Sequence, residues 1–340
     1  MRAPVLTFTD RGIHCPAGDF YIDPWRPVDR ALVTHGHSDH ARPGHRRYLA
    51  THAALPVIRQ RLGEITAEGA AYGEPRRIGD ATVSFHPAGH VPGSAQIRVE
   101  VGGEVWVVSG DYKTEPDGLS EPFAPVPCHA FITECTFGLP VFRWQPQAAL
   151  IAQMADWWAG NAAEGRVSIL GAYGLGKAQR IMAALPPIGP IHTHGSVEGA
   201  TQILRTQGYP IPGTTPARAG QVPPGALVIA PPSALNTPWA GRLSKAPTAQ
   251  AFASGWMALR GIRRRRGLST GFVMSDHADW PGLNTAIRAT GAERIFVTHG
   301  YTAPFRRWLV EQGYDAAVVT TDYGGDEGAP DEPVTEGDTA

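Results

Sequence analysis

The chain has 340 residues, 40 of them glycine and 31 proline, which indicates a loop-rich globular protein long enough for about two domains. No apolar run approaches the ~20 residues that a membrane span needs, and residues 1–4 lead into no signal peptide, so we expect a cytoplasmic protein without a membrane partner. The three cysteines form no C-x-x-C pair, which excludes a cysteine-rich zinc site and a disulfide framework.

The formal net charge of −1 conceals an uneven distribution. Residues 324–340 contain six acidic side chains and no basic one, so residues 1–323 carry a formal net charge of +5. We expect residues 324–340 to form a disordered acidic tail. The mildly basic remainder, which includes four consecutive arginines at residues 263–266, is compatible with a polyanionic partner but does not identify one.

The first candidate site is the sequence Thr-His-Gly-His-Ser-Asp-His at residues 34–40, which follows a short apolar strand at residues 31–33. Four of its side chains can bind a metal ion: His35, His37, Asp39 and His40. An isolated histidine is more often a structural residue, but three histidines and an aspartate within six positions indicate metal ligation. We expect the first two donors to face one point in space and the last two to face another.

Further donors are predicted at the ends of later strands. Three apolar, alternating segments predict a β-meander: residues 82–86, 95–100 and 105–108. His90 lies in the loop after the first of these strands, Asp111 follows the third, and Glu134 ends a buried strand at residues 130–133. Each alone would most often be a turn residue, but their shared position just beyond a strand end predicts a common site.

After residue 145 the pattern changes to strands that alternate with helices. The predicted strands are residues 167–170, a short one near 191, and 227–230, and the predicted helices are 146–161, 177–185 and 197–206. Such alternation is typical of a parallel α/β unit. We therefore predict a second domain at residues 145–265, inserted into the first.

This region contains a sequence similar to a nucleotide-binding P-loop. Residues 171–178 read Gly-Ala-Tyr-Gly-Leu-Gly-Lys-Ala, and Ala178 stands where a P-loop needs a Ser or Thr hydroxyl for Mg²⁺. NTP binding is therefore not expected. The Gly-rich turn, the helix N-terminus and Lys177 could instead meet a phosphate of a longer substrate.

The first domain is expected to resume near residue 266. A strand at residues 271–274 ends before His277, and a strand at residues 294–297 ends before His299. The other expected elements are helices at 280–290 and 304–312 and a strand at 316–320. Two more histidines are thus predicted at strand ends.

These donors allow two metal sites that share one carboxylate. One site would comprise His35, His37, His90 and Asp111, and the other Asp39, His40, His299 and the same Asp111. Nitrogen and oxygen donors without thiolate suit Zn²⁺ or Mn²⁺, and the donor types do not choose between them. Two such cations can generate hydroxide near neutral pH and stabilise the attacking and leaving oxygens of a displacement.

In this order the motifs resemble those of the metallo-β-lactamase fold and, within it, of the β-CASP nucleases. The motifs are His-x-His-x-Asp-His at 35–40, Pro-Ala-Gly-His90, Ser-Gly-Asp111-Tyr, Thr-Glu134-Cys-Thr-Phe-Gly, Ser-Asp-His277-Ala-Asp and Val-Thr-His299-Gly, with Gly-Leu-Gly-Lys-Ala-Gln179 and Ser254-Gly-Trp-Met257 in the insert. The resemblance covers about residues 5–320 and is strongest to bacterial ligase-associated DNA exonucleases. Asp39 fits the hydrolase members of the fold rather than its di-iron redox members. The combination of Glu134 with His299 is, however, seen in many RNA-processing relatives.

The resemblance implies an αββα metallo-β-lactamase sandwich with an inserted parallel α/β β-CASP domain that closes a cleft over the metal site. The implied parts are residues 1–144 and 266–323 for the metallo-β-lactamase domain, 145–265 for the β-CASP domain, and 324–340 for the tail. It also implies that Asp39 takes part in catalysis, that Glu134 orients His277, and that His277 gives a proton to the leaving oxygen. A histidine held by a carboxylate can stay protonated near pH 7, which agrees with this role.

The predicted activity is hydrolysis of phosphodiester bonds in single-stranded DNA by hydroxide that two metal ions activate, as an exonuclease in DNA repair. A DNA ligase or helicase is the partner that the resemblance implies. The alternatives are an RNA-processing endo- or exonuclease of the same family, a small-molecule ester or thioester hydrolase, and a non-catalytic nucleic-acid-binding subunit. The insert of roughly 120 residues and His277 favour the nuclease, because a small substrate needs neither.

Overall fold

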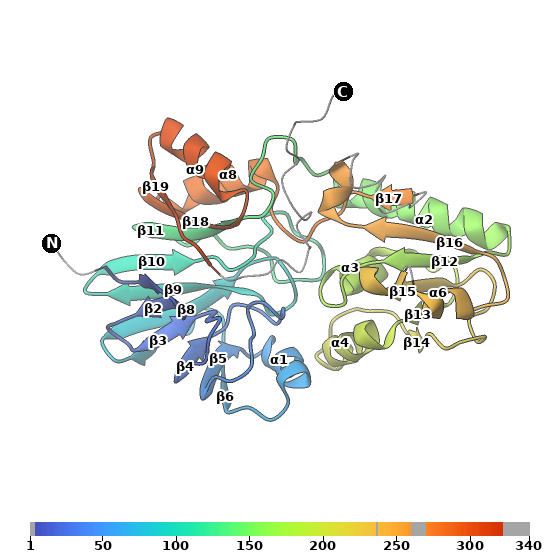
Figure 1. The fold of residues 1–340 in the computed structure, drawn as a ribbon, viewed down its shortest axis with the longest axis horizontal. Coiled ribbons are helices and arrows are strands. Elements are labelled where there is room, and N and C mark those ends of the chain that lie inside the picture. Colours follow the sequence, from blue (N-terminus) through green and yellow to red (C-terminus); the bar gives the residue numbers. More distant parts are fainter. Residues whose placement is uncertain (1–3, 236, 260–269, 322–340) are drawn as a thin grey trace, which may run out of the picture.

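The computed structural model describes residues 4–235, 237–259 and 270–321. Helices and strands are arranged around three β-sheets, so the protein has the α/β composition that the sequence predicts. Two sheets lie on one side of the molecule, and the third forms a lobe on the other side (Figure 1). The predicted tail at 324–340 and the arginines at 263–266 lie outside the described residues. Within the described ranges, no helix is long and apolar enough to cross a membrane.

The first two sheets pack face to face and are called the sandwich below. The first sheet consists of β1 (Thr7–Thr9), β2 (Gly12–Cys15), β3 (Phe20–Ile22), β4 (Arg30–Leu32), β5 (Arg47–Thr51) and β6 (Ala67–Ala70). The second consists, in spatial order, of β19 (Asp315–Val318), β18 (Arg294–Gly300), β11 (Ala130–Cys135), β10 (Glu104–Val108), β9 (Ala95–Val101), β8 (Ala81–Pro87) and β7 (Arg76–Ile78). Ile13 and Ile22 of the first sheet share a buried core with Val83 and Ile97 of the second.

Helices cover both outer faces of the sandwich. Residues of α1 (Leu55–Leu62) pack on the first sheet, and residues of α8 (Trp280–Thr290) and α9 (Thr302–Glu311) pack on the second. Local signals delimit α8, because the Asp279 side chain accepts a hydrogen bond from the Gly282 amide (2.9 Å) and Gly291 adopts the left-handed conformation that ends the helix. The layers therefore run helix, sheet, sheet, helix.

The third sheet and its helices form what we call the third-sheet lobe. Its strands, in spatial order, are β14 (Thr215–Pro216), β13 (Ile191–Thr193), β15 (Leu227–Ala230), β12 (Val167–Gly171), β16 (Thr248–Ala253) and β17 (Thr270–Phe272). Its helices are α2 (Gln147–Ala163), α3 (Lys177–Ala184), α4 (Gly195–Thr206), α5 (Pro232–Leu235), α6 (Pro238–Arg242) and the 3₁₀ helix η1 (Gly255–Ala258). Each pair of neighbouring strands is parallel, which confirms the predicted parallel α/β unit.

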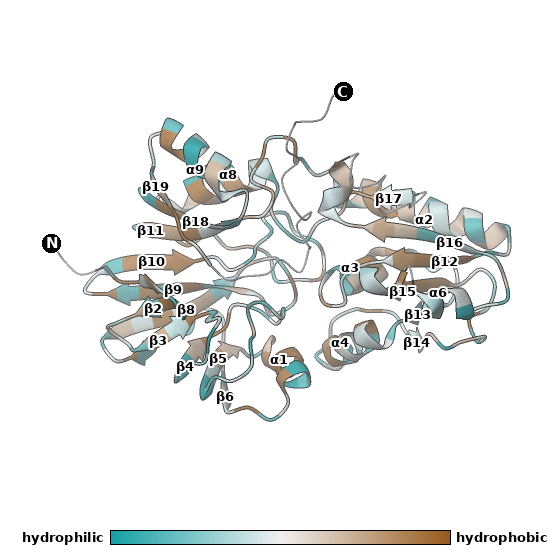
Figure 2. Cartoon of the chain, in the orientation of Figure 1, coloured by the Kyte–Doolittle hydropathy of each residue, from teal (hydrophilic) through white to brown (hydrophobic). Residues whose placement is uncertain are grey.

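Both faces of this sheet are buried. Leu170 packs with α2, α3 and α4 on one face, whereas its neighbour Ile169 packs with α5 and α6 on the other. Strands covered on both sides have continuous apolar sequences, and β12 and β15 are accordingly brown in Figure 2.

The strand predicted at residues 271–274 lies in a different sheet from the one expected. β17 pairs with β16 in the third-sheet lobe, where Gly271 is opposite Phe252, so this strand does not belong to the sandwich. The prediction was wrong on this point because an apolar run predicts a strand but not the sheet that it joins. The sandwich elements resume after β17, with residues 275–279 leading into α8.

Candidate metal centre

The candidate donors meet at one edge of the sandwich. β10, β11 and β18 are parallel neighbours, so their carboxyl ends lie side by side and bring Asp111, Glu134 and His299 together. The segment after β4 reaches the same edge, where the Thr34 carbonyl accepts a hydrogen bond from the Ala95 amide (2.9 Å). All nine donors predicted from the sequence belong to groups whose ligand atoms lie within 4.8 Å of one another.

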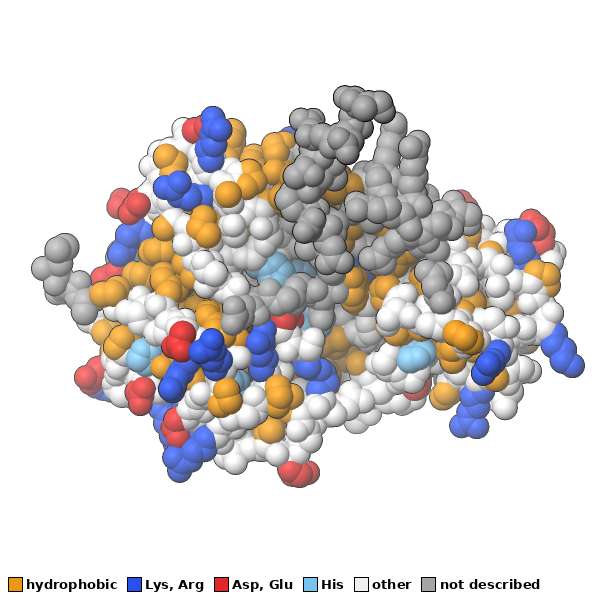
Figure 3. All heavy atoms as spheres, in the orientation of Figure 1, with side chains coloured by type: hydrophobic (Ala, Val, Ile, Leu, Met, Phe, Trp, Pro, Cys, Tyr) orange, Lys and Arg blue, Asp and Glu red, His pale blue; other side chains and the backbone are white. Residues whose placement is uncertain are grey.

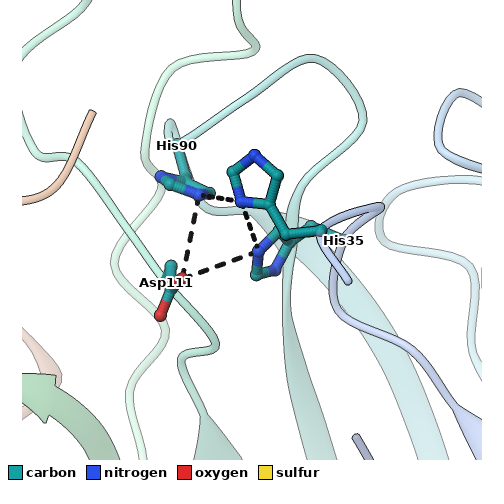
Figure 4. Close-up of side chains that lie close together, drawn as sticks. His35, His90 and Asp111 are labelled. Carbon is teal, nitrogen blue, oxygen red and sulfur yellow. Dashed lines mark hydrogen bonds and ion pairs between the residues drawn. The ribbon is translucent and has the colours of Figure 1, made fainter. Parts of the chain in front are cut away.

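The first group comprises His35, His37, His90 and Asp111, all buried. His37 Nδ1 lies 3.1 Å from His35 Nε2 and 3.1 Å from His90 Nε2. Asp111 Oδ2 lies 3.6 Å from His35 Nε2 and 3.8 Å from His90 Nε2. Figure 4 shows the labelled side chains of His35, His90 and Asp111 pointing toward one another. Such convergence of three imidazoles and a carboxylate is typical of a metal site.

Hydrogen bonds on the outer side of these rings select the nitrogen that faces inward. His37 Nε2 donates to the Leu175 carbonyl (3.2 Å), and His90 Nδ1 donates to the Asp276 carbonyl (3.0 Å). A carbonyl oxygen can only accept, so each of these nitrogens carries the proton. The lone pairs of His37 Nδ1 and His90 Nε2 are therefore directed into the group, as metal ligation requires.

The second group comprises Asp39, His40 and His299. His40 Nε2 lies 3.7 Å from Asp39 Oδ2 and 3.5 Å from Asp111 Oδ2, so Asp111 lies between the two groups. His299 reaches this position through a bulge in β18, because Glu134 is opposite Thr298 and Cys135 is opposite Gly300. His299 has a φ of 52°, and bulges of this kind commonly redirect a side chain at a sheet edge.

Asp23 is part of the site, and our sequence analysis missed it. Its carboxylate, 1% exposed, accepts hydrogen bonds from His40 Nδ1 (2.7 Å), Thr34 Oγ1 (2.6 Å) and the Thr34 amide (2.8 Å). Thr34 Oγ1 in turn lies 3.0 Å from His35 Nδ1, so Asp23 orients one histidine of each group. The sequence did contain a feature that could have identified Asp23, because this residue directly follows β3, just as the other donors follow strands.

The electrostatics of the site depend on these neighbours. Burial, with the nearby rings of His40, His90 and His37, lowers the pKa of His35 well below its usual value. Burial also lowers the pKa of His90. Burial alone would lower the pKa of His40, but the carboxylates of Asp111, Asp39 and Asp23 raise it well above its usual value. A bound cation would compete with that proton.

The residues present fit a pair of divalent cations. Asp111 Oδ1 is buried and, among the described residues, has no hydrogen-bond partner, although an unsatisfied buried carboxylate oxygen is costly. The donor set contains imidazole nitrogens and carboxylate oxygens only, which suits Zn²⁺ or Mn²⁺. That the nine residues bind metal or act in catalysis stays a prediction.

Glu134 and His277 form a third group with Asp111. Glu134 Oε1 lies 2.9 Å from His277 Nδ1 and accepts the Tyr112 amide (3.2 Å), while Oε2 accepts the Thr136 amide (3.1 Å) and hydroxyl. A carboxylate held by so many donors is fixed in place, and it fixes the His277 ring in turn. His277 Nδ1 therefore carries the proton that bonds to Glu134.

Comparisons with known proteins place this geometry in context. No family model matches the chain. A protein named "Probable DNA ligase" from Opitutus terrae is 29% identical over 315 residues, which are 92% of this chain and 31% of the relative. "Ribonuclease TTHA0252" from Thermus thermophilus is 28% identical over 212 residues, which are 54% of this chain and 46% of the relative. An "RNase J-like protein" from Methanocaldococcus jannaschii is 26% identical over 213 residues, which are 52% of this chain and 50% of the relative. The chain is related in sequence to proteins named as nucleases.

The chain matches only part of each of these relatives. The chain spans only 31% to 50% of the length of these relatives. A crystal structure of a protein of unknown function from Enterococcus faecalis V583 has a TM-score of 0.54 at 12% identity, covering 87% of this chain and 80% of that one, which shows a likeness of fold alone. The narrower resemblance to ligase-associated exonucleases stays a prediction.

A cleft adjoins the first group between the sandwich and the third-sheet lobe. It has a volume of about 470 Å³, and its lining includes His37, Arg61, Tyr173 and Ser196. Figure 3 shows histidine atoms in the hollow between the two halves of the molecule. Lys177 does not line this cleft and is completely buried, so the suggestion that it meets a substrate phosphate was wrong.

Proposed function

We propose that the protein is a metal-dependent nuclease of the metallo-β-lactamase fold and β-CASP family that hydrolyses phosphodiester bonds, with single-stranded DNA as the favoured substrate and exonuclease action in DNA repair. The observation that carries the proposal is the carboxylate-held His277 beside a seven-donor set for two divalent cations. The helix, sheet, sheet, helix order supports it, as do relatives named as nucleases. Residues 1–144 and, after β17, the segment from residue 275 onward would form the metallo-β-lactamase domain, and residues 145–265 together with β17 would form the β-CASP domain.

The chain would hold the two cations, Zn²⁺ or Mn²⁺, with His35, His37, His90 and Asp111 in one group and Asp39, His40, His299 and Asp111 in the other. When bound, they supply Lewis-acid activation of water and stabilise charge on the phosphate oxygens. Asp23 keeps His40 and, through Thr34, His35 in the ligating orientation. Carboxylate and carbonyl partners of this kind typically set metal affinity.

His277 would act as general acid. Glu134 accepts the His277 Nδ1 proton, so the other ring nitrogen, Nε2, is the atom that can give a proton to the departing alkoxide. The negative charge of Glu134 stabilises the imidazolium from which that proton comes. A thioester has a weakly basic thiolate leaving group with less need for such an acid, so this pair favours a phosphodiester over a thioester.

The test is a digest of end-labelled single-stranded DNA and RNA of the same sequence with Mn²⁺ or Zn²⁺. We expect cleavage of DNA that shortens the strand from one end. Asp39→Ala and His40→Ala should abolish it, whereas Asp10→Ala, which changes an exposed carboxylate outside the site, should leave it unchanged. No cleavage of either strand by protein with two bound metal ions per chain would contradict the proposal.

RNA is the second candidate substrate, and the names of two relatives favour it. The same digest separates the two, because an RNA-processing enzyme would cut the RNA strand and leave the DNA strand intact. Internal fragments that appear before terminal nucleotides would indicate endonuclease action. A model thioester assayed in parallel tests the remaining hydrolase alternative.

A further inference from the structure

The residues that the sequence analysis compared with a P-loop have another environment in the structure. Lys177, the first residue of α3, is completely buried. Its Nζ lies 3.7 Å from Asp276 Oδ2 and 4.8 Å from the centre of the Tyr173 ring. Its positive charge is therefore directed at the sandwich side of the junction, at the residue before His277.

A second cation of α3 binds the same carboxylate. Arg180 lies three residues after Lys177, and its Nη1 donates to Asp276 Oδ1 (3.0 Å) and to the Ser275 carbonyl (2.8 Å). Its Nε donates to Gln147. Each carboxylate oxygen of Asp276 thus faces a different cation from the third-sheet lobe, and at most 3% of each of these three charged residues is exposed.

A buried ion cluster of this kind is a poor way to gain stability. Desolvation of the charges largely offsets their attraction, and apolar side chains of similar volume often stabilise a fold as well or better. The cluster does, however, define position, because a bidentate carboxylate between two fixed cations has little freedom. Its neighbours therefore indicate what it positions.

The main chain of Asp276 contacts the candidate metal ligands. Its carbonyl accepts the hydrogen bond from His90 Nδ1 (3.0 Å) that turns His90 Nε2 toward the first group. The Leu175 carbonyl, two residues before Lys177, does the same for His37 (3.2 Å). Two of the three histidines in the first group thus donate their outer hydrogen bond to a carbonyl that belongs either to the third-sheet lobe or to a residue that this lobe holds.

We propose that Lys177 and Arg180 are positioning residues for the metal centre: by holding Asp276 they fix the carbonyl that orients His90, and so they set the metal affinity of the His35, His37, His90 and Asp111 group. This inference rests on the proposed two-metal function. It means that the third-sheet lobe, besides covering the cleft, completes the first metal group. The second group has its own partner, Asp23, and does not depend on α3.

The test measures binding of Mn²⁺ and of Zn²⁺ to metal-free full-length protein by isothermal titration calorimetry. In Lys177→Met and Asp276→Asn we expect one of the two binding steps to weaken about 10- to 100-fold, the usual effect of removing an outer partner of a ligand, and the other step to stay unchanged. His40→Ala damages the second group, so this variant should retain one metal-binding step, that of the first group. Adding Lys177→Met to His40→Ala should weaken this remaining step. Arg180→Lys, which keeps the charge, should show a smaller loss.

Tyr209→Phe is the matched control. Tyr209 also donates from the third-sheet lobe to a carboxylate on the sandwich side, that of the half-buried Glu121, but it bonds to no candidate ligand. It should leave both binding steps unchanged. Equal weakening in this control would mean that any loss of contact between lobe and sandwich disturbs the site, and would overturn the specific role of α3.

The other outcomes are equally decisive. Wild-type protein that binds neither metal would refute the proposed function itself. Wild-type protein that binds two ions, with Lys177→Met and Asp276→Asn binding both as tightly, would refute only the inference. The double variant Lys177→Met/Asp276→Asn removes one charge of each sign and guards against a fold lost through an unpaired buried charge. Loss of fold in every variant, seen by circular dichroism, would assign the cluster a purely structural role and overturn the proposal.

Discussion

Replacement of Asp23 by asparagine should weaken metal binding while keeping the shape of the site. Asp23 Oδ2 accepts the proton of His40 Nδ1 at 2.7 Å and that of Thr34 Oγ1 at 2.6 Å, and Oδ1 accepts the Thr34 amide at 2.8 Å. An asparagine side chain has one oxygen and one NH₂ group, so it cannot accept on both sides. Whichever way it turns, at least one of these donors is left opposite another donor.

The magnitude follows from the bond that is lost. A hydrogen bond to a charged group contributes about 1.5–3 kcal/mol, and about 1.4 kcal/mol corresponds to a factor of ten in affinity. We therefore expect the metal affinity of the group that contains His40 to fall about 10- to 100-fold, in line with other partners of ligating histidines. The first group should change less, because Asp23 reaches His35 only through Thr34.

Calorimetric titration of metal-free protein with Mn²⁺ and with Zn²⁺ measures both steps. Asp10→Asn is the control, because the Asp10 side chain is 71% exposed and pairs with the exposed Arg26 at 2.9 Å. Surface pairs of this kind contribute under about 1 kcal/mol, so this variant should bind metal as wild type does. If Asp23→Asn bound both ions with unchanged affinity, the orienting role of this carboxylate would be wrong.

Three further predictions follow from other contacts. Glu134→Gln should lower kcat about 10- to 100-fold without changing KM or metal content, because it removes the charge beside His277. Loss of a metal ion from this variant, measured by atomic emission, would instead make Glu134 a metal ligand. Burial lowers the pKa of His45 to about 4. Below about pH 6.5 the unfolded chain therefore binds a proton at His45 that the folded chain does not bind. The free energy of unfolding should consequently fall as the pH drops toward 4. His45→Phe should flatten that part of the profile in urea titrations, and an unchanged slope would contradict the burial argument. Phe131→Ala should lower the free energy of unfolding, measured by urea denaturation, by about 3–5 kcal/mol, because the Phe131 ring is fully buried under α8. A smaller loss would mean that the surrounding side chains collapse into the cavity that the substitution leaves.

Sequence periodicity was sufficient to locate most of the elements near the site. The predicted strands at 105–108 and 294–297 correspond to β10 and β18, and the predicted helix at 177–185 corresponds to α3. Side-chain periodicity within an element is a local property, so a single sequence reveals it. The donors were recognisable for the same reason, because each follows or ends a predicted strand and carboxyl ends of parallel strands lie together.

Only the tertiary structure decided the surroundings of those donors. His90 receives its outer partner from Asp276, 186 positions away, and no local pattern links the two. The tertiary structure also decided which sheet β17 joins, because its apolar sequence fits either sheet. It likewise decided the partner of Lys177: the Gly-rich turn suggested a phosphate, but Lys177 contacts a buried carboxylate. The sequence by itself thus determined which residues are candidates for metal binding, since donor type and strand position are local. The fold determined which nitrogen of His37 and His90 faces inward and what holds it there, because those contacts form only when distant segments pack together.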